Sequence, residues 1–342
     1  MIRKLFTLLL LVGLGLLGFL YYQIMVVPVV PEDSTSPVTV TVPSGADYEQ
    51  VMDTLAAAGI TPNRHFFDPL AERMAYKRPE MRAGRFAIEP GISALELIRQ
   101  LRGGDKLTVE VVLTTEREPE NVAAKVARFL EADSLDFVQL FQDESYLIEL
   151  GYTKETLMTL FIPNTYELYW DASPEQFMER MVKEHDRFWS SEGRREKAKA
   201  QGLSRAEAYT LASIVYSESL AASEQARIAG LYLNRLQQGV LLQSDPTAVF
   251  ANRVFGVRRV LYKHIELDHP YNTYVHKGLP PGPITMPSMS SIEAVLNPED
   301  HEYIFMCAKG DNSGLHNFAK TAAGHSRNKA VYVANLKARG LR

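Results

Sequence analysis

The strongest pattern in the chain is an uninterrupted apolar run near its beginning. Residues 5–27 carry no charged side chain, and about 20 apolar residues suffice to cross the hydrocarbon core of a membrane as a helix. The run is longer than the roughly 7–15 apolar residues of a typical signal peptide, and no A-x-A cleavage pattern follows it. It therefore predicts a transmembrane helix, with an uncleaved or unusual signal peptide as the alternative.

The charges on either side of this run indicate its orientation. Arg3 and Lys4 precede it within the segment 1–4, whereas Glu32 and Asp33 follow it. Because Lys and Arg are enriched on the cytoplasmic side of membrane helices, the pattern predicts a cytoplasmic tail and an extracytoplasmic body. We therefore expect a single-pass protein of the cytoplasmic (inner) membrane, with its body on the periplasmic side.

After residue 27, the pattern of apolar and polar positions divides the chain into a linker, a small unit and a larger unit. Residues 28–37 are rich in proline and polar side chains, which is typical of a linker. The range 38–104 is predicted as a small α+β subdomain. Its expected elements are a strand at 38–42, helices at about 47–58 and 63–75, a strand near 84–88, and a capped helix that ends before Gly103.

The range 105–342 is predicted as a larger α+β domain. A strand is expected at 107–113, and helices at about 118–131, 134–142, 144–150, 173–189, 204–218 and 223–238. The aromatic-rich segment 160–170 is unlike a helix. The segment 303–308 reads as a buried strand, so we expect Cys307 to be a packed, inert thiol.

Composition narrows the classes of partner. The chain has 37 Lys and Arg residues against 41 Asp and Glu residues, and this mild acidity argues against nucleic acid as a partner. Cys307 is the only cysteine, so no intrachain disulfide can form. No G-x-S-x-G, Walker or H-E-x-x-H motif occurs, and the eight histidines show no metal-ligand spacing. We therefore expect neither a metal nor a cofactor.

One acidic residue stands in an unusual place for a carboxylate. A capping box at Ser204 begins a helix, and at about 100° per residue Glu218 falls on the same apolar face as Leu211 and Val215. Burial there, together with the helix C-terminus, should raise the pKa of Glu218, as a general acid near neutral pH requires. The alternative is a Glu218 that reaches solvent or pairs with a buried Arg235, as most helical glutamates do.

Two polar segments follow this helix and could hold a ligand. In the first, Gln243, Ser244 and Asp245 come before Pro246, and Asp245-Pro246 reads as an N-cap and first helical residue. In the second, hydrogen-bonding groups on aromatic bodies, typical of sugar binding, are supplied by Tyr271, Asn272, Thr273 and Tyr274. A proline-rich loop, 278–284, comes next. Turn chemistry alone is the alternative for both segments, and a structural role is the more common one for His316.

Five blocks of sequence carry a resemblance to a known family. They are LASIVYSE at 211–218, IAGLYLNRL at 228–236, LQSDPT at 242–247, YNTY at 271–274 and GLPPGPI at 278–284. Their order and spacing, over about 38–335, resemble those of the endolytic murein transglycosylase (YceG-like) family. The segment FIPNTY at 161–166 resembles the F-P-D-T-Y segment of that family.

The resemblance implies a lyase (EC 4.2.2.-) that acts on peptidoglycan. Such an enzyme cuts the β-1,4 bond between N-acetylmuramic acid and N-acetylglucosamine within a strand and leaves a 1,6-anhydro-muramic acid end. The catalytic glutamate of the family falls on Glu218, which would act first as acid and then as base. The resemblance also implies a LysM-like subdomain at 38–104 and a YceG-like catalytic domain at 105–342. Peptidoglycan synthases and proteins of the division or elongation machinery are candidate partners.

Some positions depart from the pattern of the family. Tyr216 stands where a glutamate is usual, Asn164 where an aspartate is usual, and the residues 286–289 replace the usual N-P-G-type turn. Two alternatives to this function stay open. One is a hydrolysing muramidase, with Asp245 or Glu224 as the second carboxylate that hydrolysis needs. The other is a non-catalytic scaffold that binds glycan.

Overall fold

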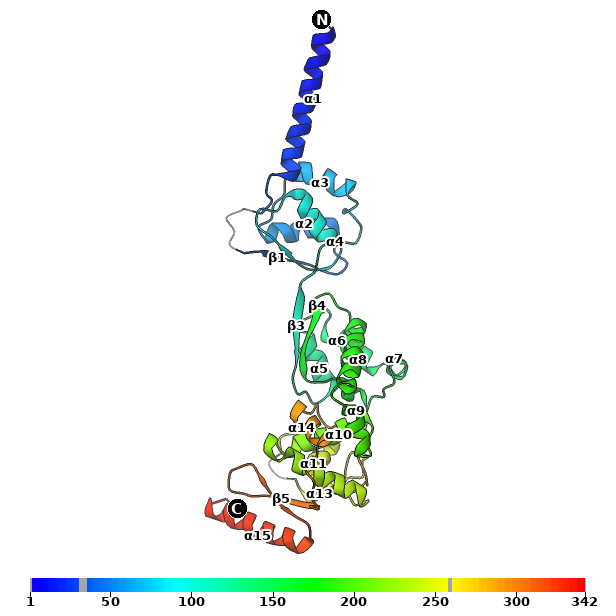
Figure 1. The fold of residues 1–342 in the computed structure, drawn as a ribbon, viewed down its shortest axis with the longest axis vertical. Helices are drawn as coiled ribbons and strands as arrows, with labels where there is room; N and C mark the ends of the chain where they lie inside the picture. Colours follow the sequence, from blue (N-terminus) through cyan, green and yellow to red (C-terminus); the bar gives the residue numbers. More distant parts are fainter. Residues whose placement is uncertain (1, 31–35, 258–259, 342) are drawn as a thin grey trace. The chain divides into compact units, whose positions relative to one another are not determined.

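The computed structural model describes residues 2–30, 36–257 and 260–341, and they form two compact units (Figure 1). The first unit comprises Met1–Val111, Phe129–Ala132 and Glu167–Ser173. The second comprises Val112–Arg128, Asp133–Tyr166 and Pro174–Arg342. The fold is of the α+β class, as expected, and it is mostly helical.

The first helix, α1, covers Ile2–Met25, and none of its residues is buried. Its mean hydropathy of 2.2 and its length are enough to cross a membrane. The helix begins earlier than the apolar run, so Arg3 and Lys4, expected in a tail, belong to its first turn. Such a helix is consistent with a membrane anchor.

The segment expected as a linker begins inside the first unit. The Val29 backbone N–H donates to the Ile92 carbonyl at 2.8 Å, and the Gly91 N–H donates to the Val30 carbonyl at 3.0 Å. The Val30 side chain is only 1% exposed and belongs to the core of the unit. Residues 28–30 are therefore packed chain and not a free spacer, because the apolar pair Val29-Val30 finds a core to join. Residues 31–35 of the expected linker lie outside the described residues.

The small unit is built from the elements that periodicity predicts. They are β1 (Val38–Val42), α2 (Tyr48–Ala57), α3 (Arg64–Arg73), β2 (Gly84–Ile88) and α4 (Ala94–Gly103). The strands β1 and β2 pair antiparallel, with Val40 opposite Phe86, and both side chains are buried. Capping boxes begin α2 at Asp47 and α4 at Ser93, which is why sequence located these two starts well.

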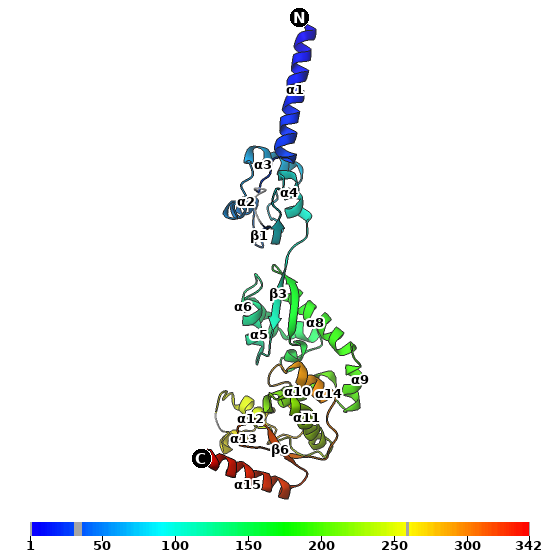
Figure 2. The same cartoon turned by 60° about the vertical axis from the view of Figure 1, so that its left-hand side comes forward.

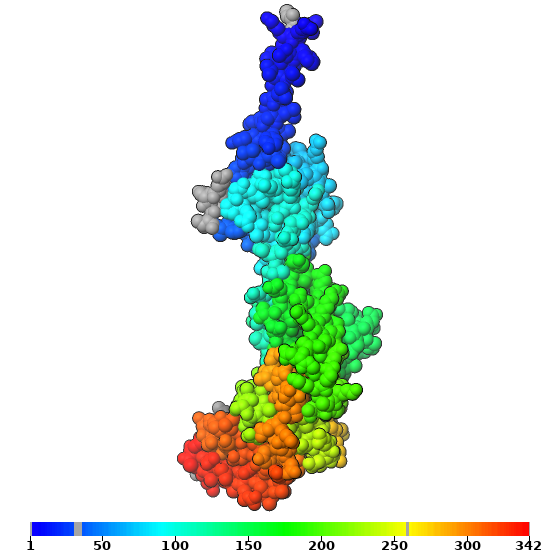
Figure 3. All heavy atoms as spheres, in the orientation of Figure 1, coloured from blue at the N-terminus to red at the C-terminus, as the bar shows by residue number. Residues whose placement is uncertain are grey.

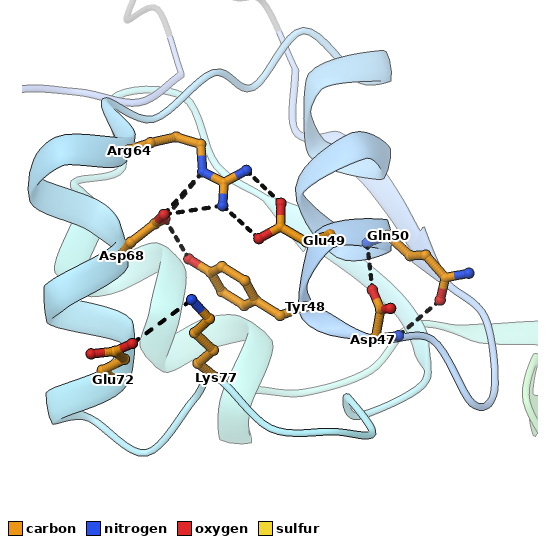
Figure 4. Close-up of polar contacts among 8 residues, drawn as sticks. All are labelled: Asp47, Tyr48, Glu49, Gln50, Arg64, Asp68, Glu72 and Lys77. Carbon is orange, nitrogen blue, oxygen red and sulfur yellow. Dashed lines mark hydrogen bonds and ion pairs between the residues drawn. The ribbon is translucent and has the colours of Figure 1, made fainter.

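A network of polar side chains joins α2 to α3 (Figure 4). The Tyr48 hydroxyl donates to Asp68 Oδ1 at 2.8 Å. The Arg64 guanidinium bridges Asp68, at 3.0 Å, and Glu49, at 2.7 Å. Burial alone would raise the pKa of Asp68, but the hydrogen bonds from Arg64 and Tyr48 outweigh it and hold that pKa below its usual value. This network therefore contains an ionised carboxylate whose charge is balanced within the unit.

The strands β3 (Thr108–Leu113) and β4 (Asn164–Tyr169) pair with each other, and the boundary between the two units runs through both. The segment 160–170, expected not to be helical, supplies β4 after a short 3-10 helix, Leu157–Leu160. The first helices of the second unit are α5 (Pro119–Val126), α6 (Ser134–Gln142), α7 (Glu144–Glu149), α8 (Pro174–Ser190) and α9 (Arg194–Ala200). The helix α5 ends before the predicted residue 131.

The core of the second unit is formed by three helices, α10 (Arg205–Glu218), α11 (Ala222–Gln237) and α14 (Met289–Leu296) (Figures 1 and 2). Around them lie α12 (Asp245–Asn252), α13 (Tyr262–Ile265), the antiparallel pair β5 (Phe305–Ala308) and β6 (His316–Ala319), and α15 (Ala322–Ala338). None of the residues of α15 is buried, and this helix lies on the surface of the unit (Figure 3).

Two local expectations in this unit need correction. Ser244, and not Asp245, occupies the N-cap of α12, and Asp245 is the first helical residue. Cys307 does lie in a strand, but it is only partly buried, because β5 and β6 form a two-stranded sheet that leaves part of the strand uncovered. His316 begins β6, and the pairing with β5 explains its extended backbone.

Candidate active site

Glu218 is the last residue of α10, and its carboxylate is held on one side only. Its Oε1 accepts hydrogen bonds from the Tyr232 hydroxyl at 2.7 Å and from the Ser244 hydroxyl at 2.5 Å. Ser244 is the N-cap residue of α12, yet its hydroxyl makes no cap hydrogen bond there, because it is directed at Glu218. Within the described part of the chain, Oε2 has no hydrogen-bond partner.

The surroundings of Glu218 differ from those that the helical wheel predicts. Every residue from Ala208 to Val215 is buried, so α10 is a core helix and has no single apolar face. The helix leaves the core only in its last turn, where Ser217 is exposed and Glu218 is half-buried. Glu218 is partly buried because it lies where a buried helix meets a cavity. Its angle on the helical wheel does not explain this environment.

Burial raises the pKa of Glu218, and the hydrogen bonds from Ser244 and Tyr232 lower it by less. Smaller effects come from His316, which lowers this pKa, and from Asp245, which raises it. The raised pKa expected from sequence is therefore confirmed, although the cause is the tertiary environment. The direction suits a group that must carry a proton at neutral pH.

Two cavities of the second unit meet at Glu218. The first, of about 420 Å³, is lined by residues that include Arg117, Tyr216, Phe250 and Phe255. The second, of about 280 Å³, is lined by residues that include Tyr232, Arg235, Tyr274 and His316. Glu218 and Asp245 line both cavities. A chain-like ligand could therefore extend from this carboxylate in two directions.

Four of the seven expected binding residues lie at the site. Gln243, Asp245 and Tyr274 line the second cavity, and Ser244 donates to Glu218. Asp245 also accepts a hydrogen bond from the Tyr274 hydroxyl at 2.5 Å. Gln243 has a φ of 51°, which is rare for a residue other than glycine and is often found at functional sites. This strained residue immediately precedes the serine that contacts Glu218.

The other three expected binding residues, Tyr271, Asn272 and Thr273, pack beside the two cavities and line neither. Asn272 is fully buried and donates to the carbonyls of Ile265 and Leu267. Thr273 is 1% exposed, and its Oγ1 accepts from the Ser244 N–H at 3.1 Å. The ring of Tyr271 packs 4.7 Å from that of Phe250. None of the three lines either cavity, but Thr273 fixes the backbone of Ser244 and so supports the contact to Glu218.

The alternative that Glu218 pairs with Arg235 is wrong. The Arg235 guanidinium donates instead to the backbone carbonyls of Leu241, Leu242 and Ile304. It also reaches Gln243 Oε1 at 3.2 Å, so it holds the loop that precedes Ser244. Burial lowers the pKa of Arg235, consistent with a cation that is bound by carbonyls and not by a carboxylate.

Sequence reasoning missed Tyr232, which donates to Glu218 from α11. In sequence it is one of several apolar positions in a helix that is apolar around most of its circumference, and nothing local distinguishes it. The only available signal is that a fully buried tyrosine normally needs a partner for its hydroxyl. Tyr232 is 1% exposed, and that partner is Glu218.

The two candidates for a second carboxylate lie in different surroundings. Asp245 is exposed and lines both cavities. Glu224 is 4% exposed and is bound by His316, from the backbone N–H at 3.0 Å and from Nδ1 at 2.8 Å. Glu224 is therefore occupied within the protein, and Asp245 is the carboxylate that is open to a ligand beside Glu218.

Comparison with known proteins decides the family. The sequence model of the YceG-like family matches residues 40–331. The chain belongs to the YceG-like family. The endolytic murein transglycosylase of Bacillus subtilis is 27% identical, over 93% of this chain and 91% of that protein. The endolytic murein transglycosylase of Streptococcus pneumoniae is also 27% identical, over 96% of this chain but only 65% of that longer protein.

A solved structure supports the same family. The crystal structure of a putative YceG-like protein from Listeria monocytogenes matches with a TM-score of 0.55 and 25% sequence identity. The match covers 86% of this chain and 99% of the Listeria chain. The resemblance noted from the five sequence blocks is therefore confirmed.

The positions that depart from the expected YceG-like pattern have different surroundings. Tyr216 lines the first cavity beside Glu218, so its side chain is available to a ligand. Asn164 begins β4 and accepts a hydrogen bond from the Thr165 N–H, and it lines neither cavity. Met286 is fully buried, and its N–H donates to the Glu116 carbonyl at 2.7 Å. Of the three, only Tyr216 lies where it could contact a substrate.

Proposed function

We propose that this YceG-like protein is an endolytic peptidoglycan lytic transglycosylase. It cleaves the β-1,4 bond between N-acetylmuramic acid and N-acetylglucosamine within a glycan strand and leaves 1,6-anhydro-muramic acid ends. The observation that carries the proposal is Glu218, a carboxyl group of raised pKa at the meeting point of two cavities. Cavities on both sides of the acid suit a bond inside a strand, because sugars must be held before and after it.

The hydrogen bonds to Glu218 indicate which oxygen carries the proton. A hydroxyl donor needs an acceptor with a free lone pair, and Oε1 accepts from both Tyr232 and Ser244. The proton of the neutral carboxyl group therefore belongs on Oε2. Tyr232 and Ser244 thus orient the acid, and Oε2 is the atom that presents its proton to a substrate.

The reaction needs only this one carboxyl group. Glu218 donates its proton from Oε2 to the glycosidic oxygen as the bond to C1 breaks. The resulting carboxylate then takes the proton of the C6 hydroxyl of the same muramyl residue, while the C6 oxygen bonds to C1. The acid is regenerated and no water is consumed. Proton transfer of this kind typically raises the rate of a reaction by about 10²–10⁴-fold. Positioning of the strand must therefore supply much of the remaining acceleration.

The cavity walls supply contacts for the sugars. Gln243, Asp245 and Tyr274 present hydrogen-bonding groups in the second cavity. Phe250 and Phe255 offer apolar surface in the first cavity. Ser244 acts on the carboxyl group of Glu218, and Thr273 supports Ser244. We therefore assign sugar contacts to the cavity-lining residues and a supporting role to Asn272 and Thr273.

Hydrolysis is the second candidate reaction, and Asp245 is the observation that favours it. This carboxylate is exposed and shares both cavities with Glu218, so it could act on a water molecule. The two reactions differ in their products, because hydrolysis leaves reducing muramic acid ends. Mass spectrometry of digested peptidoglycan separates the two outcomes.

The decisive experiment compares the wild type with Glu218→Gln on purified peptidoglycan. We expect 1,6-anhydro ends from the wild type and a loss of about 10²–10⁴-fold in the variant. Reducing ends from the wild type would show that the enzyme is a hydrolysing muramidase and not a transglycosylase. Equal digestion by the two proteins would remove Glu218 from the mechanism, whereas no digestion by either protein would favour the non-catalytic scaffold.

The N-terminal part of the chain extends the proposal to the place of action. The helix α1 would anchor the protein in the cytoplasmic membrane, and Arg3 and Lys4 would keep its N-terminus in the cytoplasm. The order β1–α2–α3–β2 in the first unit supports a LysM-like subdomain within 38–104, followed by the catalytic domain at 105–342. Anchored in this way, the enzyme would trim or terminate nascent strands beside peptidoglycan synthases and division or elongation proteins.

A further inference from the structure

A histidine bound to a carboxylate lines the second cavity together with Glu218. His316, the first residue of β6, lies beside Glu224, which is in the first turn of α11. The imidazole Nδ1 is 2.8 Å from Glu224 Oε1, and the side chains are 13% and 5% exposed. The backbone N–H of His316 donates to the other oxygen, Oε2, at 3.0 Å. The backbone of His316 therefore holds the Glu224 carboxylate, and the carboxylate holds the ring through Nδ1.

These contacts determine where the imidazole carries its proton. Burial would raise the pKa of Glu224, but the hydrogen bonds from His316 outweigh it and hold that pKa below its usual value. Glu224 is therefore an ionised acceptor, and Nδ1 must carry the hydrogen that it binds. In the neutral imidazole the lone pair is then on Nε2. A carboxylate that fixes a histidine tautomer in this way is common in catalytic and metal sites.

The free nitrogen of this histidine belongs to the second cavity. His316 lines that cavity together with Glu218, and a positive charge on His316 would lower the pKa of Glu218. Within the described residues, Nε2 has no hydrogen-bond partner. Of the other polar groups of this cavity, Asp245 Oδ1 accepts from the Tyr274 hydroxyl, and the Arg235 guanidinium is a donor bound to carbonyls. Nε2 is thus a hydrogen-bond acceptor available to a hydroxyl group of the substrate.

We propose that His316, oriented by Glu224, accepts a hydrogen bond at Nε2 from the C6 hydroxyl of the muramyl residue and directs that hydroxyl towards C1. This inference rests on the proposed function and adds a second residue to it. As the C6 oxygen bonds to C1, the hydroxyl hydrogen turns from Nε2 to the Glu218 carboxylate and is transferred there, so His316 gains and loses no proton. Its contribution is to hold the internal nucleophile close to C1, because ring closure must be faster than attack by water.

The test uses two substitutions at one position. In His316→Asn the amide can replace the Nδ1 donor to Glu224, but nothing remains at the position of Nε2. In His316→Gln the longer side chain returns an amide oxygen towards that position. We expect His316→Asn to lower the rate of anhydro-end formation about 10-fold and to raise the fraction of reducing ends. His316→Gln should be closer to the wild type than His316→Asn, both in the rate of anhydro-end formation and in the fraction of reducing ends.

Matched variants separate this role from a structural one. His276 forms a similar pair with Asp268 at 2.8 Å, but it is 45% exposed and lines neither cavity, so His276→Gln should behave as the wild type. Glu224→Gln should shift the product ratio in the same direction as His316→Asn, because it frees the imidazole to change tautomer. The folded state of each variant is checked by its thermal unfolding curve.

The ratio of anhydro to reducing ends decides the inference. If His316→Asn is folded and slower but leaves the ratio of the wild type, His316 does not direct the nucleophile. If His316→Asn does not fold, the ratio of anhydro to reducing ends is measured for His316→Gln and Glu224→Gln instead. A ratio equal to that of the wild type in both variants overturns the inference. A wild type that forms no anhydro ends overturns the proposed function instead, so the two failures are distinguishable.

Discussion

Asp68 in the first unit and Glu218 in the second are carboxylates in closely similar contacts. Each accepts a hydrogen bond from a buried tyrosine, at 2.8 Å from Tyr48 and at 2.7 Å from Tyr232. The pKa of Asp68 is nevertheless lowered, whereas that of Glu218 is raised. The difference therefore lies in the other groups that surround each carboxylate.

A cation decides the outcome. Asp68 has the Arg64 guanidinium at 3.0 Å, and this charge-assisted contact outweighs the cost of burial (Figure 4). Among the described residues, Glu218 has only two neutral hydroxyl donors, both on Oε1, and burial prevails. A carboxylate whose charge is balanced inside the protein has a structural role. One that is buried without its cation and open to a cavity is ready to exchange a proton with a ligand.

The largest expected difference between the two carboxylates is in activity. Glu218→Gln should lower the release of anhydro-muropeptides by about 10²–10⁴-fold. Asp68→Asn makes the same chemical change in the first unit and should leave the rate on short soluble strands within about 2-fold of the wild type, because surface and structural changes away from the site rarely alter chemistry. A comparable loss in both variants would contradict the distinction drawn here.

The pH dependence sharpens the comparison. Activity requires protonated Glu218, so it should fall as the pH rises through the raised pKa of this group. The hydrogen bonds from Ser244 and Tyr232 lower that pKa, so Ser244→Ala and Tyr232→Phe should each move the fall to higher pH. Asp68→Asn should not move it. Rates on soluble strands measured between pH 4 and 9 give the profiles, and a shift to lower pH in Ser244→Ala would argue against the assigned hydrogen bond.

The smallest expected effect is on stability, and its sign should differ between the two sites. The folded pKa of Glu218 is raised, so its ionisation opposes folding as the pH rises above about 4.3, the ordinary value for Glu. Glu218→Gln should therefore stabilise the second unit at pH 7, by about 1 kcal/mol. The folded pKa of Asp68 is lowered, so its contribution is present at pH 7 and is lost as the pH falls through that folded pKa. Asp68→Asn should destabilise the first unit at pH 7, by about 1 kcal/mol.

Amide hydrogen exchange reports the two units separately. Slower exchange in α10 and α11 is expected for Glu218→Gln, and faster exchange in α2 and α3 for Asp68→Asn. The difference for Asp68→Asn should disappear at a pH low enough to protonate Asp68 in the wild type. If both Glu218→Gln and Asp68→Asn destabilise their units at pH 7, the ionised form of Glu218 is stabilised by its surroundings as well as that of Asp68.

Local signals explain the parts of the fold that sequence predicted well. The capping boxes at Ser93 and Ser204 begin α4 and α10, because each satisfies backbone groups within a single turn. The strands at 38–42 and 84–88 follow from alternation alone. Prediction was weaker where distant residues decide, as at residue 316, which joins β6 only because β5 is its partner.

The candidate site was predicted in part for the same reason. Glu218, Gln243, Ser244, Asp245 and Tyr274 were expected in the site, and the structure places them around one pair of cavities. Asn272 and Thr273 look the same in sequence, since both are polar residues in a loop beside aromatic ones. Only their burial shows that they support the loop, and burial depends on which segments pack over it.

Sequence alone determined the apolar helix, the order of the elements and the family of the chain, because these follow from periodicity and from blocks of local sequence. Only the tertiary structure decided which polar groups meet. The two donors to Glu218 come from 14 and 26 residues away, and Glu224 is 92 residues from His316. Hydrogen bonds have short range and strict direction, so these partners are set by the packing of distant segments. The same packing buries Glu218, and the raised pKa of its carboxyl group is a consequence of that burial.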